Sequence, residues 1–235
     1  MKRITSWQIL VAALVIGGWP VCAAGQARRT PPRRPDGYYL YKMYREGKDE
    51  EARAGVIQRV RRRLDQAKKI KRVQTAQQAG MRVPSYVFFS LLGTCLGQEA
   101  KKGRTPEDVL KLCDELISAF DEGLPELKKW AKEEPRIANG IRLTVMGKVN
   151  LLLREIAILR DAGKRDRAKG LAQKHETFLK RWSVPIDELC GQKEVYFWLG
   201  RCPGPKPFRL TRVEKVDGKM SDPTYIGVAP RPADK

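Results

Sequence analysis

Apolar residues recur every three or four positions through most of the chain, and this spacing limits the fold more than any other feature. The clearest example lies between residues 106 and 123. Its apolar positions are Val109, Leu112, Cys113, Leu116, Ile117 and Phe120. Such residues share one face of an α-helix, which must be buried against another element. The sequence therefore predicts an all-α fold of stacked antiparallel helical hairpins, with about five or six helices.

The ends of these helices are predicted from capping residues, prolines and glycines. The predicted helices cover residues 39–46, 50–78, 83–96, 106–122, 137–160 and 164–182. We expect Thr105 to cap the fourth helix, Pro106 to occupy its first position and Gly123 to end it. The fifth helix is apolar on more than one side, so it is expected to be central, with Gly140 and Gly147 allowing neighbours to approach closely.

Beyond Pro185 the pattern changes. Residues 194–199 and 208–213 are β-prone, and Asp217-Gly218 is a hairpin-turn dipeptide. We therefore predict a small, irregular, partly β extension that is pinned by a disulfide and has a loose tail. The predicted organisation is a signal peptide at 1–24, a disordered basic lead-in at 25–37, a helical domain at 38–184 and the extension at 185–235.

The first 24 residues have the three parts of a secretory signal peptide. Lys2 and Arg3 precede an apolar core at 9–16, and small residues follow at 22–25. Cleavage is expected after Ala23 or Ala24, which would place the mature protein in the periplasm or the medium without a transmembrane segment. An uncleaved membrane anchor is the alternative, although the apolar run is shorter than the about 20 residues that span a bilayer.

Four cysteines follow the predicted signal peptide. They are Cys95, Cys113, Cys190 and Cys202. In an oxidising compartment an even number favours disulfides, and we expect Cys190 to pair with Cys202 and Cys95 with Cys113. Free thiols remain the alternative for Cys95 and Cys113, which lie in apolar surroundings. No cysteine or histidine spacing is typical of a zinc site, and no metal or cofactor is expected.

The chain is strongly basic. Its formal net charge is +20, and removal of Lys2 and Arg3 would leave +18, a charge that attracts nucleic acid, anionic lipid, cell-wall polymers or acidic proteins. Export argues against cytosolic nucleic acid. The densest basic cluster consists of Arg59, Arg61, Arg62, Arg63, Lys68, Lys69, Lys71 and Arg72. This cluster predicts a polyanion-binding helix; the alternatives are a solvated face, or ion pairs with the acid-rich segment 107–134.

Catalytic motifs are sparse. The single histidine, His175, excludes two-histidine zinc sites, and no nucleophile elbow, P-loop or dinucleotide fingerprint is present. We expect His175 to lie half-buried in a helix interface. The adjacent acidic pairs are Glu107/Asp108, Asp114/Glu115, Asp121/Glu122 and Glu133/Glu134. They are expected to be solvated, as is typical of the polar faces of helices. A sugar-stacking platform of Trp130, Trp182 and Trp198 is disfavoured because Trp182 falls on an apolar stripe.

Two inter-helix turns share one pattern. Gly47 is followed by Ala52 in GKDEEA, and Gly163 by Ala168 in GKRDRA. The pattern resembles the inter-helix turn of tetratricopeptide repeats, in which a small residue ends one helix and an alanine lets the next pack closely. The resemblance covers these two turns only. It implies helical hairpins that stack through small residues.

These observations predict a non-enzymatic, exported helical scaffold that binds another protein or an acidic surface. The first alternative is a binder of polyanions or cell-envelope polymers that acts through residues 59–72. The second is a hydrolase with a carboxylate pair, because such acids need to be close only in space.

Overall fold

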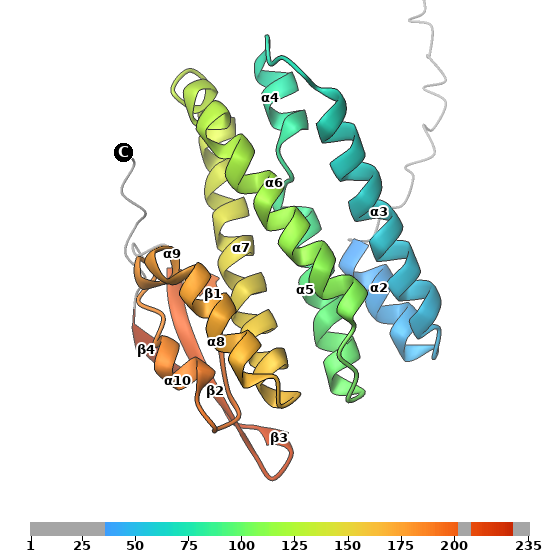
Figure 1. The fold of residues 1–235 in the computed structure, drawn as a ribbon, viewed down its shortest axis with the longest axis vertical. Helices are drawn as coiled ribbons and strands as arrows, with labels where there is room; N and C mark the ends of the chain where they lie inside the picture. Colours follow the sequence, from blue (N-terminus) through green and yellow to red (C-terminus); the bar gives the residue numbers. More distant parts are fainter. Residues whose placement is uncertain (1–35, 202–207, 228–235) are drawn as a thin grey trace, which may run out of the picture. The chain divides into compact units, whose positions relative to one another are not determined.

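The structure, a computed structural model, describes residues 36–201 and 208–227 (Figure 1). The predicted signal peptide, almost all of the basic lead-in, most of the predicted tail and Cys202 lie outside these ranges. Within them the chain is mostly α-helical and carries a small antiparallel sheet at its C-terminal end, as predicted. No helix in the described ranges is both long enough and apolar enough to cross a membrane.

Helices occupy the chain from residue 36 to residue 190, and strands follow. The helices are α2 (Asp36–Arg45), α3 (Asp49–Lys69), α4 (Ala76–Arg82), α5 (Tyr86–Lys101), α6 (Glu107–Ala131), α7 (Pro135–Asp161), α8 (Arg165–Lys174), α9 (Glu176–Lys180) and α10 (Ile186–Cys190). The strands are β1 (Val195–Arg201), β2 (Phe208–Val216), β3 (Lys219–Met220) and β4 (Thr224–Gly227).

The two turns with the shared pattern have the same geometry. Gly47 and Gly163 both adopt the left-handed conformation, with φ of +74° and +75°. In each turn the N–H after the glycine donates to a carbonyl five residues earlier, Lys48 to Met43 at 3.0 Å and Lys164 to Leu159 at 2.9 Å. This arrangement satisfies the last carbonyls of a helix and requires glycine. Ala52 and Ala168 are both buried, so both predicted helix hairpins are confirmed.

The predicted helix over 50–78 is wrong at its C-terminal end. α3 ends at Lys69, Ile70 is extended, and α4 begins after Thr75, whose hydroxyl accepts a hydrogen bond from the Gln78 N–H at 3.2 Å. The cause is twofold. Like charges at 68–72 would repel one another along a continued helix, and Thr75 supplies an N-cap for a new one.

The boundaries of α6 also differ from the prediction. The helix continues through Gly123 and Pro125 to Ala131, and Thr105 does not cap it, because Pro106 occupies the N-cap position. Gly123 serves a different purpose. A Cβ atom at this position would lie 2.5 Å from Val83 Cγ2, so the glycine permits a close approach to the segment before α5.

The last predicted helix is divided at His175. α8 ends there and α9 begins directly afterwards, and the short α10 follows Pro185. Ala168, Ala172, Leu179 and Trp182 are buried as their spacing predicts, so the apolar stripe continues across the break. Trp182 is therefore a core residue and not part of a stacking platform.

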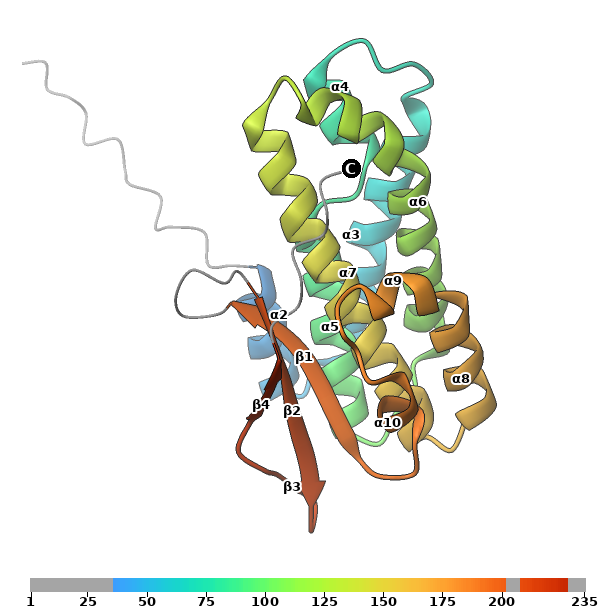
Figure 2. The same cartoon turned by 90° about the vertical axis from the view of Figure 1, so that its left-hand side faces the viewer.

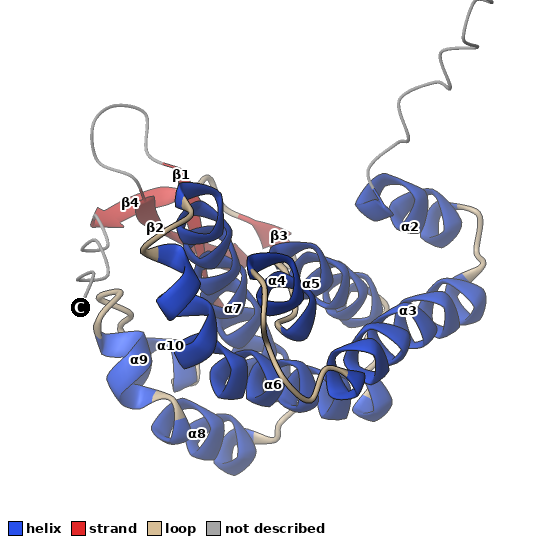
Figure 3. Ribbon diagram, turned by 90° about the horizontal axis from the view of Figure 1, so that it is seen from above, coloured by secondary structure: helices blue, strands red, loops and turns tan. Residues whose placement is uncertain are grey.

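α7 is the central helix. It packs against α5, α6, α8, α10 and β1, and Figure 3 shows α5, α6 and the sheet grouped around it. Three consecutive residues, Leu151, Leu152 and Leu153, are each no more than 1% exposed. Because successive helical side chains are about 100° apart, burial of three in a row means that neighbours cover α7 on most sides. The predicted central position is confirmed.

One of the two glycines expected to allow close neighbours does so. A Cβ atom on Gly147 would lie 2.9 Å from Tyr86 Cδ2 and 3.1 Å from Phe89 Cβ, so this glycine brings α5 against α7. Gly140 has no atom within 4 Å of the same position, and the expectation for it is wrong, because Gly140 lies on an exposed side of α7.

The C-terminal sheet docks on α7 through β1. β1 and β2 pair antiparallel from Val195↔Glu214 to Arg201↔Phe208, and β1 runs beside α7 (Figure 2). The Asn150 amide nitrogen donates to the Leu199 carbonyl at 2.8 Å, and its oxygen accepts from the Leu199 N–H at 2.5 Å. Asp217 and Gly218, both at positive φ, turn β2 into β3, which confirms the predicted hairpin.

The cysteine prediction is wrong for Cys95 and Cys113, which are buried free thiols. Burial raises the pKa of the Cys95 thiol to about 11 and that of Cys113 well above its ordinary value. Both act as small core residues of α5 and α6, which was the alternative. Cys190 is also a free thiol, and its predicted partner Cys202 lies outside the described residues.

Alanine substitutions at Gly140 and Gly147 should have opposite effects on the free energy of unfolding. Gly147→Ala should lower the free energy of unfolding by about 1–3 kcal/mol, because the added methyl group meets Tyr86 and Phe89. Gly140→Ala is the matched control and should raise it by about 0.5–1 kcal/mol, because the site is open and alanine favours the helix. Urea denaturation measures both, and equal effects would contradict the central packing of α7.

Candidate functional site

The outer side of α3 carries exposed basic residues. Val56, Val60 and Leu64 are buried, which leaves the charged positions of the helix facing outwards. We call six exposed basic residues the basic surface: Arg61, Arg62, Lys68 and Lys69 of α3, with Lys71 and Arg72 in the segment that follows the helix. No side chain of the six makes a hydrogen bond or ion pair with another residue of the described ranges.

The basic surface excludes two members of the predicted polyanion-binding set. Arg63 donates to the carbonyls of Gly80, Met81 and Val83 at 3.0, 2.5 and 3.0 Å, so it ties α3 to α4 and the segment after it. Burial lowers its pKa. Arg59 is exposed but has interactions of its own, and we do not assign it to the surface.

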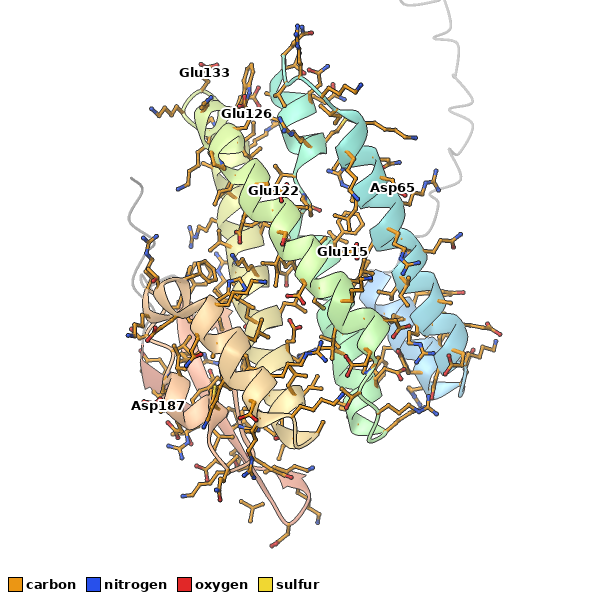
Figure 4. All side chains as sticks on the ribbon, in the orientation of Figure 1. Asp65, Glu115, Glu122, Glu126, Glu133 and Asp187 are labelled. Atoms are coloured by element: carbon orange, nitrogen blue, oxygen red, sulfur yellow. The ribbon has the colours of Figure 1, made fainter. Side chains whose placement is uncertain are left out.

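The spacing of the basic surface matches an extended partner. Arg61 and Lys68 are seven residues apart, as are Arg62 and Lys69, which puts each pair on one side of α3 at about 10 Å along its axis. One acid, Asp65, stands between the pairs (Figure 4). Two rows of like charge on one rigid helix can meet successive negative charges of a linear polymer or of an acidic protein face.

The acid-rich segment does not neutralise the basic surface. Figure 4 shows Glu115, Glu122 and Glu126 along α6 and Glu133 in the turn that follows it. The ion pairs of this segment with basic residues are Glu107 with Lys164 and Arg167, Asp108 with Arg53, Asp114 with Lys174, Asp121 with Lys148, and Glu126 with Lys129. No partner in these pairs belongs to the basic surface. The alternative of ion pairs between 59–72 and 107–134 is therefore contradicted for its six residues.

A second candidate site is a cavity between α6, α7 and α8. It has a volume of about 270 Å³, and we call it the Glu155 cavity. Its lining consists of Asp114 from α6, Glu155 and Leu159 from α7, and Arg167, Gly170, Leu171 and Lys174 from α8. Glu155 is only 1% exposed, and its Oε2 has no hydrogen-bond partner in the described chain.

Burial determines the protonation of Glu155. It raises the pKa of this carboxyl to about 8, and the charge of Asp114 acts in the same direction. Arg167 and Lys174 oppose the shift but do not cancel it. Glu155 is thus a neutral acid at pH 7.

Next to this cavity, Lys148 and His175 lie at the packing surface of α7. Lys148 is buried and its ammonium donates to both oxygens of Asp121, at 2.7 and 2.6 Å, while lying 4.3 Å from the centre of the Phe178 ring. His175 is buried at the junction of α8 and α9, and its Nε2 has no hydrogen-bond partner among the described atoms. Burial, with Lys148 nearby, lowers the pKa of His175 and keeps the imidazole neutral at pH 7.

A third polar cluster links the first hairpin to α5. The Tyr44 hydroxyl donates to Glu99 Oε1 at 2.8 Å, and Glu99 is fully buried. Arg104 lies 3.8 Å from its other oxygen, and Lys102 donates to Asp49 at 2.6 Å. Glu99 Oε2 has no hydrogen-bond partner among the described atoms and is balanced by the nearby charge of Arg104. The hydrogen bonds of Tyr44 and Lys102 make the cluster a structural link that fixes α2 and α3 on the helical core.

Sequence reasoning missed Glu155, although a signal was present. Glu155 stands in LLLREIAIL with Leu152 and Leu159 one helical turn away on either side, so it falls on an apolar face. The predicted acidic pairs were neighbours in sequence, whereas Asp114 and Glu155 meet only because α6 packs on α7. Trp198 is exposed on β1 and Trp130 is half-buried on α6; together with the buried Trp182, they form no common surface element.

Comparison with known proteins found no matching family model, no matching curated protein and no matching solved structure. The resemblance to tetratricopeptide repeats therefore stays a prediction that rests on the turns at Gly47 and Gly163.

The titration of Glu155 should make stability depend on pH. The folded carboxyl holds its proton to about pH 8 and the unfolded one releases it near 4.5, so the native state binds more protons between these values. Stability is therefore lost as pH rises through this range, by up to about 1.4 kcal/mol per pH unit. Glu155→Gln should remove this loss, and urea denaturation of both proteins from pH 5 to 8 measures the difference.

Glu115→Gln is the matched control, because Glu115 is an exposed glutamate on α6 with no ion pair in the described ranges. Its stability should follow the wild type at every pH. A constant difference between Glu155→Gln and the wild type across the range would contradict the burial of a protonated Glu155.

Proposed function

We propose that the protein is a helical scaffold that binds an acidic partner along the basic surface of α3. The observation that carries the proposal is that six exposed cations have no acidic partner within residues 36–201 and 208–227, while the acid-rich segment pairs with other bases. Export to the periplasm or the medium is part of the proposal and rests on residues 1–24.

Electrostatics makes this surface suited to binding. The charges are solvated, so each contact with a phosphate, sulfate or carboxylate contributes modestly, and affinity comes from several contacts in series. The net charge of the whole chain adds long-range attraction. Both effects weaken as salt rises, because the screening length is about 8 Å at physiological ionic strength.

α3 is held in place by α4, α5 and α6. The buried stripe of α3 packs on α5 and α6, and Arg63 holds the end of the helix to the segment around α4. The four side chains of the basic surface that lie on α3 therefore project from a fixed backbone, which reduces the entropy lost when a partner binds.

A non-catalytic role belongs to the same proposal. The hydrolase alternative stays a prediction, and Asp114 and Glu155 are the carboxylates that it would use, since they line one cavity.

Neutralising four residues of the basic surface should weaken polyanion binding. The wild type should bind a heparin column at low salt and elute below about 0.5 M salt, where screening of exposed pairs is nearly complete. The quadruple variant Arg61→Gln, Arg62→Gln, Lys68→Gln and Lys69→Gln should elute at a clearly lower salt concentration than the wild type, because both rows of charge are lost.

The matched control has the same change in net charge, but its substitutions lie on α8 and in the segments after α9 and α10. It carries Arg165→Gln, Lys169→Gln, Arg181→Gln and Lys193→Gln, all at exposed positions that make no ion pair in the described chain. It should elute close to the wild type. Equal losses in the two variants would show that net charge alone governs retention, and would refute a specific surface on α3.

A further inference from the structure

The outer face of the C-terminal sheet carries two exposed aromatic side chains. Phe197 and Leu199 of β1 are buried in the core beside α7, so the alternate side chains of the strand project to the other side of the sheet. There Trp198 of β1 lies opposite Thr211 of β2, and Thr211 lies opposite Tyr225 of β4 (Figure 2). Trp198 is 41% exposed and Tyr225 is 51% exposed.

A glycine fixes the orientation of the indole of Trp198. A Cβ atom on Gly200 would lie 3.0 Å from Cη2 of Trp198 and 3.1 Å from its Cε3, so the six-membered ring of the indole covers this glycine. One face of the ring rests on the backbone of β1. Because much of Trp198 is exposed, the opposite face is open to solvent, where a second flat ring can stack on it.

Arg209 adds a positive charge beside the indole. It lies opposite Gly200 in the pair of β1 and β2, which places it on the same face as Trp198. Only Nε of its guanidinium is buried without a partner; the two terminal nitrogens make no hydrogen bond or ion pair with the described residues and are accessible to solvent. The one acid in β1, β2 and β4 is Glu214, and it lies on the other face, opposite the buried Val195.

We propose that this face, which we call the Trp198 face and define by Trp198, Arg209 and Tyr225, binds a pyranose ring that carries a carboxylate, as in the uronic acid units of an anionic polysaccharide. The indole would stack on the C–H groups of the ring, because the face of an aromatic ring is negative and these hydrogens are slightly positive. The terminal nitrogens of Arg209 would bind the carboxylate through two parallel N–H···O bonds. The site is separate from the basic surface and goes beyond the proposed function.

Tyr225 extends the site to a second sugar unit. β1 and β4 lie on either side of β2, so the backbones at Trp198 and Tyr225 are about 10 Å apart, or two strand spacings. This is close to the length of two linked pyranose units. The two aromatic residues can therefore contact neighbouring units of one chain, with Arg209 on the carboxylate of the first.

The size of the face favours a sugar over a protein partner. The part of the sheet in which β1, β2 and β4 lie side by side is limited by the four residues of β4, and it measures roughly 200 Å². A stable protein interface covers about 800 Å² on each partner. A few sugar units fit the smaller area, and a flat sheet gives them a flat support.

Calorimetry with trigalacturonate, a trimer of α-1,4-linked galacturonate, tests the proposal on the wild type. The matched neutral probe is the α-1,4-linked trimer of galactose, which has the same rings without the carboxylates. The neutral trimer should bind at least about tenfold more weakly, because it cannot form the charge-assisted bonds to Arg209. A single-stranded oligonucleotide should not displace trigalacturonate.

Substitutions separate the two contacts. Trp198→Ala should weaken binding of both trimers at least about tenfold, since stacking is lost, whereas Tyr39→Ala, at an exposed tyrosine of α2, should change neither. Arg209→Gln should weaken binding of trigalacturonate about tenfold and leave that of the neutral trimer unchanged. Arg201→Gln is its matched control, because it removes the same charge from the other face of β1, where Arg201 lies opposite Phe208.

Circular dichroism checks that each variant is folded, and the comparison of the two trimers on the wild type needs no variant. Four results would overturn the proposal: no binding of trigalacturonate, equal or tighter binding of the neutral trimer, equal losses in Arg209→Gln and Arg201→Gln, or displacement by the oligonucleotide. The quadruple variant of α3 should keep at least half of the affinity for trigalacturonate, so this test and that of the proposed function fail separately.

Discussion

The burial of α7 on most sides is the constraint on which the rest of the structure depends. A buried helix cannot leave its polar side chains to water, so each must find a partner in a neighbouring element. Asn150 binds the backbone of β1 and Lys148 binds Asp121 of α6. Arg160 binds the carbonyls of Leu189 and Val195 at 2.9 and 2.7 Å. These bonds position the sheet, α6 and α10 around one helix, and Glu155 is the acid on α7 for which no such partner is described.

Both candidate sites hold ionisable side chains without a hydrogen-bond partner among the described residues, but they differ in environment. On the basic surface the cations are solvated, which costs little and leaves them available to a large partner. In the Glu155 cavity the acid is buried, so it keeps its proton. The basic surface suits a partner held by many weak contacts, whereas burial of Glu155 affects stability and its dependence on pH.

Much of the fold follows from the sequence, because its helices are strongly periodic and its turns are marked. Gly47 and Gly163, the apolar face of α6 and the central position of α7 are all local or periodic features. Some errors are local, such as the end of α3 at Lys69. Others concern tertiary packing: Gly123 faces Val83 instead of ending a helix, and Cys95 and Cys113 are core residues instead of a disulfide. The basic cluster was recognised because its residues lie close together in the sequence. The cavity was not, because Asp114 and Glu155 meet only through the packing of α6 on α7.

The central claim is that α7 is buried deeply enough to hold Glu155 as a neutral acid. The most direct test is a carbon-13 NMR titration of the glutamate side-chain carboxyl carbons, with Glu155 assigned from the spectrum of Glu155→Gln. The account predicts a titration midpoint of about 8 for Glu155. A midpoint near 4.5, the ordinary value of a solvated glutamate, would contradict it.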